Sequence, residues 1–107
     1  MDQLAHKDLA NGRWENYSLA FQMGNIGSEV SRALKWKEKN RTDRMMECFD
    51  RALELIDLTI RDDGVESHQK ELCRAREELC DYFIGEDEFG TKPSGLMAYY
   101  DQFVTAM

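Results

Sequence analysis

The chain has 107 residues, enough for one domain with a single core. Apolar residues make up 42% and charged residues 33%, with 7 Gly and 1 Pro, so the composition excludes a disordered or collagenous chain. The formal net charge of −7 disfavours a nucleic-acid partner, because so acidic a chain repels a phosphate backbone at long range. Protein partners, metal ions or basic substrates agree better with this negative charge.

The sequence shows no membrane or export signal. No stretch approaches the roughly 18 consecutive apolar residues of a membrane span. Residues 1–13 lack the basic start and the apolar run of a signal peptide. We therefore expect a cytoplasmic protein without membrane contact, with a flexible lead at 1–12 and one domain at 13–107.

The cysteines are odd in number and are expected to be reduced. On one helix, Cys73 and Cys80 would lie about 10 Å apart, too far for a disulfide. Neither these residues nor Cys48 belongs to a closely spaced Cys or His pair of the kind that binds zinc. We predict three thiols, partly buried.

The first predicted helix lies within residues 16–40, where apolar residues recur at three- and four-residue steps. It should end at 37–40, where lysines suit the negative end of the helix dipole and Asn40 can adopt a left-handed capping conformation. The second helix lies within 42–64, with Gly64 as its stop signal. The inward positions of these two helices are Leu19, Met23, Ile26, Val30, Ala33, Leu34, Met45, Phe49, Ala52, Leu53, Ile56 and Ile60.

A third helix is predicted from Ser67 to Gly85, followed by a loop over 85–94 that holds the only proline. A shorter helix begins at Ser94. The inward positions of these helices are Leu72, Ala75, Leu79 and Phe83, then Leu96, Met97, Tyr100, Phe103 and Val104. Short links between the first three helices make them antiparallel neighbours. The sequence thus predicts an all-α antiparallel helical bundle of three longer helices and a shorter C-terminal helix.

Small residues form a ridge on the first predicted helix. Because a glycine inside a helix costs about 1 kcal/mol relative to alanine, a ridge with two of them indicates a close approach by another helix, in the same chain or in a second copy. Aromatic residues are also more numerous than one thin bundle needs to bury, and Trp and Tyr are favoured in interfaces. The predicted interface residues are Ala20, Gly24, Gly27, Ser31, Trp14 and Trp36.

Arg61 and His68 are separated by six residues. This spacing resembles that of the HEPN ribonucleases, which are also small helical bundles. The resemblance implies a phosphate-binding role for Arg61 and a proton-transfer role for His68. The alternative is that Arg61 ends the second helix, where a cation is favoured, and that His68 begins the third.

Two pairs of carboxylates lie on neighbouring predicted helices. Glu54 and Asp57 share one face, and Glu77 and Asp81 share another. Oxygen ligands from facing helices suit Mg²⁺. The pairs resemble elements of the MazG-type nucleotide pyrophosphatases, although their order is reversed and Asp81 replaces a Glu. The resemblance implies a Mg²⁺-dependent nucleotide hydrolase. The alternative is that nearby arginines pair with these acids on solvated faces.

The stretches NIGSEVSRALKWK, RALELIDLTI and CRAREELCDYF together resemble a family of small microbial helical bundles. No activity follows from that resemblance. We therefore expect a cytoplasmic protein-interaction or structural module without a cofactor, acting as a homodimer. The metal-dependent hydrolase and the HEPN-like ribonuclease remain the alternatives.

Overall fold

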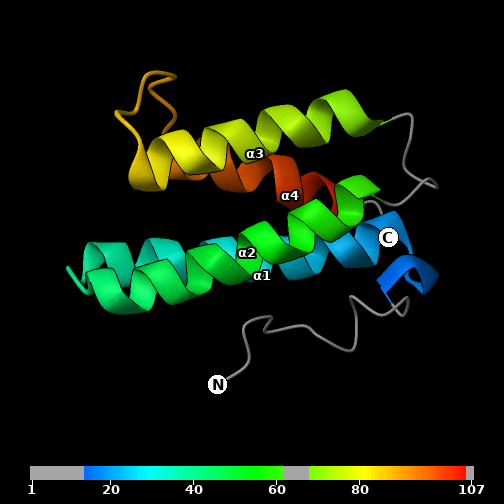
Figure 1. Ribbon diagram of the computed structural model, residues 1–107, viewed down its shortest axis with the longest axis horizontal. Helices are drawn as coiled ribbons and strands as arrows, with labels where there is room; N and C mark the ends of the chain where they lie inside the picture. Colours follow the sequence, from blue (N-terminus) through cyan, green and yellow to red (C-terminus); the bar gives the residue numbers. More distant parts are fainter. Residues whose placement is uncertain (1–13, 62–67, 106–107) are drawn as a thin grey trace.

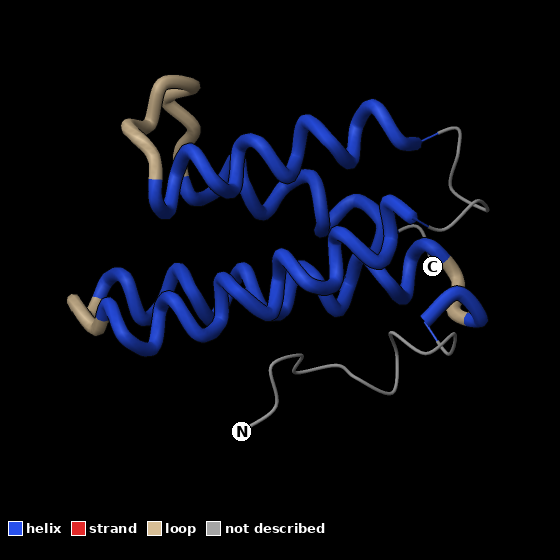
Figure 2. The backbone as a smooth tube through the Cα atoms, in the orientation of Figure 1, coloured by secondary structure: helices blue, strands red, loops and turns tan. Residues whose placement is uncertain are grey.

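The computed structural model describes residues 14–61 and 68–105. Four helices follow a short 3-10 turn, η2 (Trp14–Asn16); they are α1 (Leu19–Glu38), α2 (Thr42–Arg61), α3 (Gln69–Ile84) and α4 (Pro93–Thr105). Each helix runs antiparallel to the next along the chain (Figure 1). In the part of the chain that the structure describes, Figure 2 shows helices and loops without a strand. The predicted all-α bundle is confirmed.

Both ends of α1 are fixed by local hydrogen bonds. At its start, the hydroxyl of Ser18 accepts the backbone N–H of Phe21 at 3.1 Å, which satisfies one of the unpaired donors of the first turn. At its end, Asn40 has a φ of 58°, as predicted. The backbone N–H of Arg41 then reaches back to the carbonyl of Trp36 at 2.9 Å. This capping arrangement turns the chain directly into α2.

The other helices follow the predicted order with shifted ends. The described part of α2 ends at Arg61, and the predicted stop at Gly64 lies outside the described residues. Pro93 occupies the first position of α4, where a missing N–H breaks no helical hydrogen bond. Between α3 and α4, the carboxylate of Asp81 accepts the backbone N–H groups of Glu88 and Phe89 at 2.7 and 3.0 Å. These bonds hold the loop against the end of α3.

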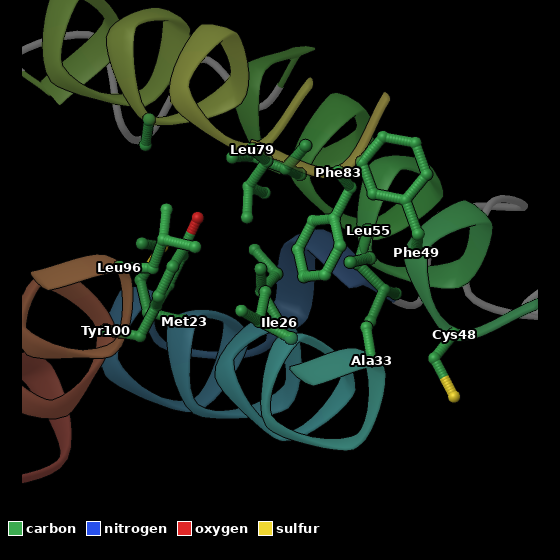
Figure 3. Close-up of a cluster of buried hydrophobic side chains, with 14 of the residues drawn as sticks. Met23, Ile26, Ala33, Cys48, Phe49, Leu55, Leu79, Phe83, Leu96 and Tyr100 are labelled. Atoms are coloured by element: carbon green, nitrogen blue, oxygen red, sulfur yellow. The ribbon is translucent and has the colours of Figure 1, made fainter. Parts of the chain in front are cut away.

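One hydrophobic core lies between the helices (Figure 3). It includes all four inward positions predicted on α3, which are Leu72, Ala75, Leu79 and Phe83. On α2, Leu55 is fully buried although it is not among the predicted inward positions, whereas the predicted Leu53 is half-buried. The rings of Phe49 and Phe83 meet with their centroids 5.4 Å apart and so join α2 to α3. Their burial makes α3 part of the same core as the α1–α2 hairpin.

Two ion pairs connect neighbouring helices of the bundle. Glu29 on α1 is buried and pairs with Arg51 of α2 at 3.3 Å. Asp57 of α2 pairs with Arg76 of α3 at 2.7 Å. Each ion pair fixes the position of one helix along the axis of its neighbour. Among the described residues, no helix is long and apolar enough to cross a lipid bilayer.

Candidate functional site

An open groove runs between α1 and α4, with a volume of about 320 Å³. It is lined by Gly24, Gly27, Ser28, Ser31, Arg32 and Lys35 of α1 and by Met97, Tyr100 and Asp101 of α4. We call it the α1–α4 groove. Because four of its α1 residues are glycine or serine, helix backbone lies close to the surface over about two turns. Side chains of both charges border this floor.

Two residues of the predicted interface are enclosed within the protomer. A Cβ atom on Gly27 would lie 2.9 Å from the Cβ atom of Tyr100, so this glycine lets α4 of the same chain approach α1. Trp14 is 3% exposed, and its Nε1 donates to Oγ1 of Thr59 at 2.9 Å. The carbonyl of Trp14 also accepts the side-chain amide of Gln22 at 2.8 Å. The Trp14 ring therefore belongs to the core rather than to an outer face.

The other predicted interface residues reach the surface in part, since Ala20, Gly24, Ser31 and Trp36 are all half-buried. Phe21 is more open, with 42% of its surface exposed, and its ring lies 4.5 Å from that of Tyr17 between centroids. Tyr17 lies just before α1 and Phe21 lies in its first turn, ahead of the small residues of the groove. A single chain does not test self-association, which stays a prediction.

Two of the four predicted carboxylates bind an arginine or backbone N–H groups of this chain. Asp57 is held by Arg76, whose pKa rises through that hydrogen bond. Asp81 binds the loop backbone, and Glu77 is exposed beside it on the outer side of α3. Within the described ranges, no group of three or more Cys, His, Asp or Glu side chains is placed to hold a metal ion. A Mg²⁺ ion at Asp57 would have to displace an arginine. The hydrolase stays an untested prediction for these four residues, including Glu54.

Arg61 is exposed at the end of the described part of α2, and His68 immediately precedes α3. The His68 ring meets the ring of Phe103 on α4, with centroids 6.2 Å apart. Residues 62–67 between them lie outside the described residues. His68 stands at the start of α3, in agreement with the alternative, and the ribonuclease interpretation stays a prediction.

A second cavity, of about 190 Å³, lies between α3 and α4. It is lined by Glu71, Arg74, Ala75, Glu78, Leu96, Tyr99 and Tyr100. We call it the α3–α4 cavity. The hydroxyl of Tyr99 donates to the carboxylate of Glu71 at 3.4 Å, whereas the buried hydroxyl of Tyr100 has no hydrogen-bond partner among the described residues. The sequence pattern placed Tyr100 inward correctly but gave no sign that its hydroxyl would be buried without a hydrogen-bond partner among the described residues.

A third, shallower hollow covers the outer side of α3 and the following loop, with a volume of about 680 Å³. Ile84 and Phe89 border it and are 58% and 45% exposed. The guanidinium of Arg74 lies over the Phe89 ring, 4.3 Å from the centroid, so part of this aromatic surface is already covered by a cation.

The three cysteines are free, as predicted, and differ in accessibility. Burial raises the pKa of the Cys48 thiol, while Cys73 is exposed. Because the thiolate is the nucleophile, alkylation near pH 8 should modify Cys73 first and Cys48 at least about tenfold more slowly. Peptide mass spectrometry over time would give the order, and labelling in denaturant is the control. Equal rates for Cys48 and Cys73 in the folded protein would show that the α1–α2 packing is open at Cys48.

The described residues define a four-helix bundle with two helix–helix recesses. No protein-family model matches this chain, and comparison with the curated proteins and with the solved structures also gives no match. The function must therefore be argued from the geometry of these recesses.

Proposed function

We propose that this chain is a cytoplasmic protein-interaction module that forms a homodimer through the outer face of α1. The observation that supports this function is the α1–α4 groove, in which small residues leave helix backbone close to the surface. Such a surface lets a second helix approach closely and gain contact along its length. The exposed ring of Phe21 lies beside it on the same helix.

The spacing of residues on α1 suits a second copy of the same helix. Phe21 precedes Ser28 by seven residues, and Lys35 follows Ser28 by seven. If two α1 helices pack antiparallel about Ser28, Lys35 of each copy lies level with Phe21 of the other. A lysine over an aromatic face contributes about 0.5–1 kcal/mol at exposed sites. The contact is made twice, because both copies use the same patch in a two-fold dimer.

The charge of the groove also favours a dimer through this face of the protein over a dimer through another face. The chain as a whole carries −7, so two copies repel each other at long range. The groove, in contrast, carries two cations, Arg32 and Lys35, and one acid, Asp101. Because Arg32 also pairs with Glu29 at 3.3 Å, the net charge near the groove is close to zero, so little of the negative charge of the chain is brought together where the two copies meet. A core this small also gains stability from dimerisation.

Sedimentation equilibrium at high micromolar concentration should give twice the 12.5 kDa mass of the chain. Gly24→Leu should shift the mass to that of the monomer, because a leucine fills the groove. Ser28→Glu should do the same by placing two carboxylates near the two-fold axis. Each variant should weaken the dimer at least about tenfold, which corresponds to 1.4 kcal/mol.

Cys73→Glu is the matched control, since it adds the same charge to the exposed side of α3. It should leave the dimer intact. A monomeric parent protein at high micromolar concentration would refute the proposed dimer. A dimer that survives both Gly24→Leu and Ser28→Glu would show that the copies meet elsewhere, for example at Ile84 and Phe89.

A further inference from the structure

Two exposed apolar side chains border the shallow hollow on the outer side of α3. Ile84 is the last residue of α3, and Phe89 lies in the loop that follows; they are 58% and 45% exposed. Among the residues that the structure describes, Phe21 on α1 is the one other exposed large apolar side chain. Apolar side chains that gather in one place on a surface, unlike single ones, mark a site that another molecule covers. We call this hollow, which extends from Arg76 to Phe89, the α3-end hollow.

The Phe89 ring is held in place before any partner arrives. Its backbone N–H and that of Glu88 both donate to the carboxylate of Asp81, at 3.0 and 2.7 Å. The guanidinium of Arg74 lies over the ring, 4.3 Å from its centroid, and is itself paired with Glu78 at 3.1 Å. Figure 1 shows the loop projecting beyond the end of α3, where a partner can reach it. An aromatic side chain that is already ordered lowers the entropy cost of binding.

The border of the α3-end hollow is acidic. Glu77, Glu86 and Glu88 line it, and all three are exposed. The one cation of the lining, Arg76, is paired with Asp57 at 2.7 Å, so the border keeps a net negative charge. Electrostatic complementarity favours a partner whose positive groups meet these carboxylates. The occupant should therefore combine apolar side chains, which cover the exposed apolar pair, with Lys or Arg side chains, which meet the border.

We propose that the α3-end hollow binds a basic amphipathic segment of a partner protein. The apolar side of the segment covers Ile84 and Phe89, and its Lys and Arg side chains meet Glu77, Glu86 and Glu88. A second copy of this chain, with a net charge of −7, is repelled at this acidic border, and so is a phosphate group. The hollow is separate from the proposed dimer, which uses α1 and α4. Binding of the basic segment therefore does not depend on self-association.

Three synthetic peptides separate the apolar contacts from the charged ones in a calorimetric titration of the full chain. The first forms an amphipathic helix with leucine on one side and lysine on the other. The second has glutamate in place of every lysine, and the third has alanine in place of every leucine. The leucine–lysine peptide should bind at least about tenfold more tightly than either of the others, because only this peptide makes both kinds of contact.

Cys80 reports whether the bound peptide lies in the hollow. Its half-buried thiol belongs to the lining, whereas Cys73, on the same helix, is exposed and lies outside the lining. The leucine–lysine peptide, free at about ten times its Kd, should slow the alkylation of Cys80 about tenfold, because a covered thiol does not react. The rate at Cys73 should stay the same. Peptide mass spectrometry over time measures both rates in one sample.

Variants of exposed residues test the two kinds of contact without disturbing the core. Phe89→Ala should weaken binding of the leucine–lysine peptide at least about tenfold. Glu86→Lys should weaken it about fivefold at about 0.1 M salt, where charges more than about 10 Å apart are screened. Glu71→Lys is the matched control, since it makes the same charge change near the other end of α3, about 20 Å from Ile84 by helix rise. It should leave the affinity within about twofold of the parent.

Four outcomes would overturn the proposal. The first is that the leucine–lysine peptide does not bind at millimolar concentration. The second is that the glutamate peptide binds equally well. The third is that the peptide slows Cys73 and Cys80 alike, or that Phe89→Ala keeps the affinity of the parent, since either result places the peptide elsewhere. The fourth is that a higher concentration of the protein alone protects Cys80, which would show that a second copy covers the hollow.

Discussion

Replacement of Trp14 by alanine should lower the free energy of unfolding by about 3–5 kcal/mol. The ring is 3% exposed, although it precedes the first long helix. Its indole N–H donates to Thr59 on α2, and its carbonyl accepts from Gln22 on α1. The variant therefore loses a large buried side chain and the link between η2 and α2. Small domains have a free energy of unfolding of about 5–15 kcal/mol in all, so urea denaturation should show the loss of a large part of the stability.

Two variants of Thr59 isolate the hydrogen-bond part of this effect. The Thr59 hydroxyl donates to the carbonyl of Leu55 at 2.9 Å, which leaves its lone pair for the Trp14 N–H. Thr59→Val should leave that N–H buried and unpaired, at a cost of about 1–3 kcal/mol. Thr59→Ser keeps the oxygen and should cost less. A loss of less than about 1 kcal/mol in Trp14→Ala would show that Trp14 contributes little to the core.

The four helices were predictable because their signals are local. A three- and four-residue apolar period needs only neighbouring residues, and so does the left-handed cap at Asn40. The inward face of α3 was predicted in full, because Leu72, Ala75, Leu79 and Phe83 follow one narrow stripe. A narrow stripe forms where a helix meets the core on one side only.

Where the core surrounds a helix more widely, the period alone is ambiguous. The α2 helix packs against α1 and also against α3, and it buries Cys48, Leu55, Leu58 and Thr59 besides the predicted positions. The role of Trp14 depends on a contact with Thr59, 45 residues later. The burial of Glu29 depends likewise on Arg51, across the α1–α2 pair. Contacts between distant residues depend on how the helices pack against one another. A local sequence pattern does not predict that packing.

The same distinction between local patterns and contacts of distant helices applies to the candidate sites. The small residues of α1 indicated a close helix approach, and the structure assigns the approach at Gly27 to α4 of the same chain. The remaining small residues line an open groove; their positions on α1 could be predicted, but the α4 residues on the opposite side could not. The α3–α4 cavity could not be predicted, since its lining combines residues of two helices that are distant in the sequence, such as Ala75 and Tyr100.

Gly27→Ala should lower the free energy of unfolding, whereas Gly95→Ala should raise it. At Gly27 the new Cβ atom would lie 2.9 Å from the Cβ atom of Tyr100, near the backbone of α4, so the helices must separate. Overpacking of this kind costs about 1–3 kcal/mol, which exceeds the roughly 1 kcal/mol gained in helix propensity. At Gly95 the nearest atom is Cγ2 of Thr91 at 3.5 Å, an ordinary contact, so only the propensity gain of up to about 1 kcal/mol remains.

Gly27→Leu should extend this series to a loss of about 3 kcal/mol or more, because no side-chain rotation moves the Cβ atom of Tyr100 away. Urea denaturation of the parent and the three variants would give the order Gly95→Ala, parent, Gly27→Ala, Gly27→Leu, from most to least stable. Comparable stability of Gly27→Leu and the parent would contradict the close contact of α1 and α4. That result would also weaken the proposed dimer, because α4 would then not form the second wall of the groove beside Ser28.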